Sequence, residues 1–157
     1  MLLRYMGSEP HPHLVRDREY VVLAIDTGGK RGTTVMVHHP EDGGAFDWAW
    51  WPLDLFEVTS PTLPTNWVLH RHKDAEVALL PAAWCRSGHW DDLDPSELDE
   101  RPADVRAAAA RRAWADYHSE RDRILVEAGQ EPGQHALPGP SCSFRPPPSQ
   151  DDQALSD

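Results

Sequence analysis

The stretch from Tyr20 to His38, YVVLAIDTGGKRGTTVMVH, decides the fold. Both of its ends are rich in β-branched residues and its middle is rich in glycine, which is typical of two short antiparallel strands joined by a turn. We therefore predict strands over residues 20–26 and 33–38, with a turn over residues 28–32. Asp26 falls at the predicted end of the first strand, where a short acidic residue is expected before a turn.

The sequence that follows extends this β unit. Residues 42–44 predict a second turn, an aromatic strand follows over residues 46–52, and residues 55–58 predict the closing strand. After two prolines we expect a second hairpin, with strands over residues 67–70 and 76–80.

A long helix is predicted between Pro102 and Ala128, because this segment has no glycine and is rich in alanine and arginine. Gly129 is placed to end it. Its apolar side chains fall near one stripe, which Arg121 interrupts. The stripe consists of Val105, Ala109, Ala110, Ala113, Trp114, Tyr117, Ile124, Leu125 and Ala128. Such a helix is longer than a small barrel, so part of the stripe could project and serve as an interface.

Several short motifs of the first third of the chain follow one another in a familiar order. They are Arg4-Tyr5-Met6-Gly7, residues 20–26, Phe46-Asp47, Trp51-Pro52 and Leu55-Phe56-Glu57-Val58. In this order, residues 4–58 resemble the small SH3-like barrels of short bacterial proteins. The resemblance implies an interaction role, because some such barrels occur in immunity or regulatory proteins, and it assigns no catalytic residue.

These observations predict an α+β fold in which an SH3-like antiparallel β barrel carries an added hairpin and packs against a long C-terminal helix. The barrel spans residues 1–60, the hairpin and an acidic segment span residues 61–100, and the helix spans residues 101–129. Residues 130–157 are rich in proline and poor in apolar side chains, which predicts a disordered tail.

The charge of the chain limits the partners it can bind. Its 157 residues carry a formal net charge of −11. A surface this acidic disfavours nucleic acid and anionic membranes and favours a basic protein partner. The N-terminus is too short and polar for a signal peptide, and the two cysteines, Cys85 and Cys142, fit a reducing compartment. We therefore expect a cytoplasmic protein.

Some motifs match catalytic or metal-binding signatures only in part. Asp26-Thr27-Gly28 copies the triplet of aspartic proteases, which also need a second aspartate from another lobe or subunit. The glycines at 28–32 lack the spacing of a phosphate-binding loop, and Cys85 with His89 forms no recognisable catalytic pair. The paired histidines lack the spacing of zinc ligands and are expected in solvated loops; the pairs are His11 and His13, His38 and His39, and His70 and His72. We predict no catalytic residue, no metal and no cofactor.

Aromatic and acidic side chains supply the predicted binding residues. Trp48 and Trp50 project to one face of their strand, where the long helix could cover them or a groove for a proline-rich peptide could form. The segment 144–148 of the tail, FRPPP, could be such a ligand within the chain. Six acidic residues fall within residues 91–100, close to two tryptophans. Acidic groups around aromatic anchors are typical of inhibitors of basic proteins, although such a run is often only a solvated face. The predicted partner-binding residues are Trp84, Trp90, Asp91, Asp92, Asp94, Glu97, Trp48 and Trp50.

The sequence thus favours an acidic, non-enzymatic interaction module, specifically an inhibitor or immunity-type protein that binds a basic protein partner. One alternative is a structural or regulatory adaptor that joins a larger assembly, or a second copy of itself, through the long helix. The other alternative is a hydrolase that uses converging histidine and aspartate residues.

Overall fold

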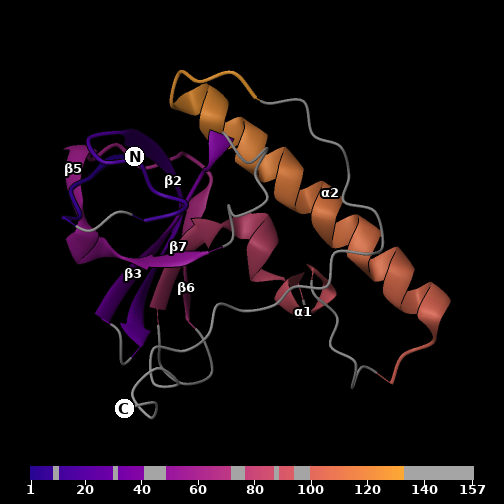
Figure 1. Cartoon of the computed structure of the whole chain (residues 1–157). Helices are drawn as coiled ribbons and strands as arrows, with labels where there is room; N and C mark the ends of the chain where they lie inside the picture. The colour runs from indigo at the N-terminus through magenta and orange to yellow at the C-terminus, as the bar shows by residue number, and fades with distance from the viewer. Residues whose placement is uncertain are drawn as a thin grey trace, which may run out of the picture.

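The computed structural model describes residues 1–8, 11–29, 32–40, 49–71, 77–86, 89–93 and 100–132. Within them lies a seven-stranded antiparallel sheet beside one long helix (Figure 1). The strands are β1 (Leu2–Tyr5), β2 (Glu19–Gly29), β3 (Gly32–Val37), β4 (Trp50–Pro52), β5 (Phe56–Ser60), β6 (Trp67–Arg71) and β7 (Val77–Pro81). The helical elements are the 3₁₀ turns η2 (Leu53–Leu55) and η3 (Ala82–Cys85) and the helices α1 (His89–Leu93) and α2 (Ala103–Glu127). The predicted α+β class, the second hairpin and the long helix are confirmed.

The sheet is organised around β2, which pairs with three other strands. β3 pairs with it along residues 22–29, β1 pairs with residues 19–21 and β7 pairs with residues 25–27. The main path runs β4-β3-β2-β1-β5, and β6 extends the sheet from β7.

The closed SH3-like barrel predicted over residues 1–60 is not confirmed, because the sheet is open. Among the described residues no pairing joins β4 to β5 or β6. One physical reason lies in β4, which has only three residues and ends at Pro52, a residue with no N–H to continue a ladder. A second reason is that the far half of β2 shares its pairing with β7.

β2 begins one residue earlier and ends three residues later than predicted. It runs to Gly29, which pairs with Gly32 across the hairpin, and the hydroxyl of Thr27 donates a hydrogen bond to the carbonyl of Val77 at 2.8 Å. Thr27 and Thr33 pair in register, as β-branched residues often do. Asp26 therefore lies inside a strand that is paired on both sides, rather than at a strand end.

Side chains alternate between the two faces of the sheet, and each face has its own core. The face toward α2 buries a cluster that includes Ala24, Met36, Leu80, Trp84 and Tyr117. The opposite face buries a second cluster made of residues of β1, β2, β3 and β5 together with Leu14. The sheet is thus covered on both sides, as its near-continuous apolar run in residues 20–25 requires.

α2 lies beside the sheet at its C-terminal end and extends past α1 at its N-terminal end (Figure 1). None of residues 103–108 is buried, and Val105, which was predicted in the packed stripe, is 46% exposed. Arg121, which was predicted to interrupt the stripe, is instead fully buried within it.

The end of α2 follows the prediction. Gly129 has a φ of 75°, which favours glycine. Its N–H donates to the carbonyl of Val126 at 3.0 Å, and the N–H of Gln130 donates to that of Leu125 at 2.9 Å. These two bonds form a Schellman motif, which satisfies carbonyls at the helix end.

Within the described part of the chain, no helix has both the length and the apolar character that crossing a membrane requires. Beyond Pro132 the predicted tail lies outside the described residues.

Candidate functional site: a pocket lined by Asp26, Trp50 and Trp90

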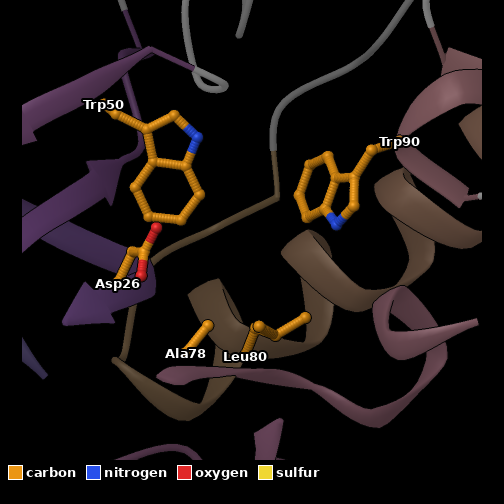
Figure 2. A pocket seen from close by; sticks show the side chains of 5 residues that line it. All are labelled: Asp26, Trp50, Ala78, Leu80 and Trp90. Atoms are coloured by element: carbon orange, nitrogen blue, oxygen red, sulfur yellow. The ribbon is translucent and has the colours of Figure 1, made fainter. Parts of the chain in front are cut away.

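A pocket of about 180 Å³ opens where α1 meets the sheet. It is lined by Asp26 of β2, Trp50 of β4, Ala78 and Leu80 of β7, and Trp90 of α1. Figure 2 shows the two indole rings on opposite sides of the pocket, with the carboxylate of Asp26 beside Trp50 and the two aliphatic side chains below. The site therefore combines aromatic walls, an apolar floor and one acidic group.

The strand register explains why these residues meet. Asp26 pairs directly with Ala78, so their side chains share one face, and Leu80 lies two residues further on that face. Trp50 pairs with Met36, which belongs to the core on the side of α2. Trp90 comes from the helical layer and packs against this core from the other side. The pocket thus forms at the border between the sheet face and its helical cover.

The carboxylate of Asp26 is the unusual feature of this pocket. Its Oδ1 atom is buried and has no hydrogen-bond partner among the residues that the structure describes. An ionised carboxylate only accepts hydrogen bonds, and burying one without a donor costs free energy. Most buried polar atoms in proteins have a partner, so this unpaired oxygen makes Asp26 a candidate contact for a donor from a ligand.

Asp92, from the predicted acidic binding run, has the opposite environment. It is 6% exposed, and its carboxylate contacts Arg86 at 3.3 Å and Arg101 at 2.8 Å. Its charge is therefore compensated inside the chain and does not face a partner. The acidic run is thus not a uniformly solvated face.

The other predicted binding residues divide into three groups. Trp50, which is 36% exposed, and Trp90, which is partly buried, come together at the pocket. Asp91 belongs to α1, but its side chain is not among those described. Trp48, Asp94 and Glu97 lie outside the described residues.

Trp84, which was also predicted as a partner anchor, is a core residue. Its ring is fully buried and stacks on Tyr117 at 4.9 Å between centroids and on His89 at 6.3 Å. η3 holds it against α2, so the side chain is enclosed by the fold and does not reach the surface.

One of the three histidine pairs expected in solvated loops is buried, whereas His11, His13 and His70 are partly exposed. His38 and His39 are buried at the end of β3, and His89 is fully buried at the start of α1. The pKa of His89 is lowered to about 4, mainly by burial and to a smaller extent by the nearby Arg86, while Asp116 and Asp92 partly oppose the shift. This imidazole is therefore neutral at pH 7.

The remaining candidate chemistry concerns metal binding, the Cys85 thiol and the protease-like Asp26. No group of three potential metal ligands occurs among the described residues, and His72 and Cys142 lie outside them. Burial raises the pKa of the Cys85 thiol, which keeps it protonated near neutral pH. Asp26 lies in a strand paired with Thr34 and Ala78, whereas the protease interpretation needs it beside a second aspartate.

Two residues have environments that differ from those predicted from the sequence. Asp26 was predicted at the end of a strand, although an acidic residue that follows an apolar strand run is itself a signal. Arg121 is fully buried, contacts Asp122 Oδ1 at 3.1 Å and lies over the ring of Tyr117 at 5.9 Å. Its position on the core stripe of the helix was the available signal.

No family model matches the chain, and comparison with curated proteins and with solved structures likewise gives no match.

Proposed function

We propose that this chain is an acidic, non-enzymatic interaction module that binds a basic protein partner, as an inhibitor or immunity-type protein does. The observation that carries the proposal is a carboxylate oxygen of Asp26 that has no partner in the described part of the chain and lies in a pocket between Trp50 and Trp90. Such a pocket is complementary to a cationic side chain. The net charge of −11 would attract a basic partner from a distance.

The size and lining of the pocket support an anchor for a side chain rather than a substrate site. Its volume of about 180 Å³ is below the roughly 300–1,000 Å³ usual for small-molecule sites. Tryptophan is also enriched among the residues that dominate protein–protein binding. One side chain of a partner in this pocket, with charged contacts around it, fits the pattern of a protein–protein interface.

We also propose that the N-terminal half is SH3-like in kind, although its sheet is open. The path β4-β3-β2-β1-β5, with η2 between β4 and β5, supports a small curled β unit over residues 1–60. The pocket uses two strands of this unit, β2 and β4, and the added hairpin supplies its floor.

The test is to immobilise the full chain and to identify proteins that it retains from the organism that encodes it. We expect a basic protein that is released as salt rises, because screening weakens attraction between exposed charges. Replacing Asp91 and Asp94 by lysine should slow its association and leave folding unchanged. Asp92 is left intact because its ion pairs stabilise the fold. An association rate that responds neither to salt nor to these substitutions would refute the proposal.

One observation favours the adaptor as a second candidate function. The first turns of α2, residues 103–108, contribute no buried residue, and Val105 is 46% exposed. This part of the helix could pack against a larger assembly or a second copy of the chain. Val105→Asp should then reduce the assembled mass in light scattering, whereas it should not change binding of a basic partner at the pocket.

A further inference from the structure

We infer that the pocket between β4 and α1 binds an arginine side chain of the partner, with Asp26 receiving the guanidinium group. This inference rests on the proposed function, because the arginine would belong to the basic protein that the module binds. It adds the chemical identity of the anchor and the residues that select it.

The unpaired carboxylate defines what the occupant must offer. Asp26 Oδ1 is buried and lacks a partner among the described residues, so an occupant with N–H donors would satisfy it. A positively charged donor does this best, since a hydrogen bond between two ionised groups is roughly twice as strong as a neutral one. The occupant should therefore be a cation with N–H groups.

The walls of the pocket select the shape of that cation. Trp50 and Trp90 present their rings from opposite sides (Figure 2). A planar guanidinium stacks on an indole face and can still direct two N–H groups at a carboxylate. A lysine ammonium is a compact and strongly hydrated charge, so it would lose more hydration energy between these rings. Ala78 and Leu80 offer an apolar floor for the methylene groups of an arginine.

Two arginines of the chain near this part of the fold are engaged elsewhere. Arg86 pairs with Asp92 and Asp116, and Arg101 pairs with Asp92. Neither pairs with Asp26, so the cation that this carboxylate fits is not supplied by them. An arginine of another protein is the occupant that the charges favour.

The experiment is an NMR titration of the full chain with a blocked Gly-Gly-Arg-Gly-Gly peptide. Indole N–H signals of Trp50 and Trp90 are assigned with Trp50→Phe and Trp90→Phe. We expect both signals to shift on titration, and the otherwise identical citrulline peptide to bind at least about tenfold more weakly, because citrulline keeps the shape without the charge. The lysine peptide should bind more weakly than the arginine peptide.

Matched variants locate the binding to Asp26. Asp26→Asn should weaken binding of the arginine peptide by about tenfold or more. Asp54→Asn removes the same charge from an exposed position in η2 and should leave affinity unchanged. Equal affinities for the arginine and citrulline peptides, or equal effects of the two variants, would overturn the inference. Tighter peptide binding by Arg145→Ala would also overturn it, because the occupant would then be the arginine of the chain's own tail.

The inference and the proposed function fail in different ways. If a basic protein is retained in a salt-dependent manner but Asp26→Asn does not affect it, the module binds a basic partner and the arginine pocket is wrong. If the arginine peptide binds at the tryptophans but no basic protein is retained, the pocket chemistry stands and the proposed function is wrong.

Discussion

Trp90 lies between two regions that use the same residue types in opposite ways. On one side, its ring packs against Trp84 and His89 at 5.7 and 5.2 Å between centroids, in a closed aromatic cluster that also includes Tyr117. On the other side, it lines the open pocket with Trp50 and Asp26. The closed cluster is adjacent in sequence to Asp92, whose charge two arginines compensate. The carboxylate in the pocket, by contrast, has a buried oxygen with no partner among the described residues.

The difference offers a way to separate residues that stabilise the fold from candidate binding residues. Trp84 stacks on Tyr117 and His89, and Asp92 is held by two arginines, so these ring contacts and this charge are completed within the fold. An aromatic pair that faces a cavity and an aspartate oxygen without a donor leave interactions to be completed from outside. Both regions contain tryptophan and aspartate, so composition alone does not distinguish them.

The largest expected effect is that of Trp84→Ala, which should break the closed cluster. Removing a fully buried indole leaves a cavity, so we expect a loss of about 4 kcal/mol in the free energy of unfolding. Trp90→Ala is the matched control and should cost clearly less, because this ring is only partly buried. Urea denaturation of the two variants measures both values. Equal losses would mean that the two tryptophans do not differ in role.

The next largest effect concerns the pH dependence of the closed cluster. Because burial lowers the pKa of His89 to about 4 from 6.5, the unfolded chain binds a proton there at a higher pH than the folded chain does. Keeping His89 neutral therefore contributes to the free energy of unfolding. This contribution is fully present above pH 6.5 and is lost as the pH falls toward 4, by about 3 kcal/mol in total.

His89→Phe keeps the ring and removes this titration. Between pH 7 and pH 4 the wild-type protein should therefore lose more stability than the variant, as measured by urea denaturation at each pH. Parallel pH profiles for the two proteins would show that His89 is not held neutral by the fold.

A smaller effect is expected from removing the partners of Asp92. Replacing both Arg86 and Arg101 by alanine leaves a buried carboxylate uncompensated, which should cost about 2 kcal/mol. The value is below that of a fully buried pair because these arginine side chains are 38% and 39% exposed. Arg4→Ala is the control, since its pair with Glu19 lies at the surface, where ion pairs contribute at most about 1 kcal/mol. Thermal unfolding measures both variants. An equal decrease in melting temperature for the double variant and for Arg4→Ala would contradict the role given to Asp92.

The smallest effect is predicted for Asp26→Asn, which, unlike the other substitutions, should not lower the free energy of unfolding. Removing an unpaired, partly buried charge should leave stability unchanged or raise it by less than about 1 kcal/mol. Asp92→Asn, the same substitution in the compensated region, should lower stability. Chemical denaturation of the two variants sharpens the comparison directly, and a clear loss of stability in Asp26→Asn would place Asp26 among the structural residues.

Much of the secondary structure could be predicted from the local sequence. The β-branched runs on either side of the glycines predicted β2 and β3, and the alanine-rich segment ending at Gly129 predicted α2. These features depend on residue propensity and on backbone conformations that few residues adopt, which act within a few positions along the chain. Trp50 was predicted from its aromatic strand and Trp90 from its place beside the acidic run, and both line the pocket.

The tertiary structure decided which side chains are buried and which charges find a partner within the fold. Whether Asp92 meets arginines, whether Trp84 is enclosed and whether Arg121 lies inside or outside the helix stripe all depend on contacts between distant segments. Residues 25–27 of β2 pair with β7, a strand about fifty residues away, and that pairing placed Asp26, predicted at a strand end, inside the sheet and in a pocket wall. Propensity acts locally, whereas the partners of a buried charge come from the whole fold, so the sequence determined the elements and only their packing determined the site.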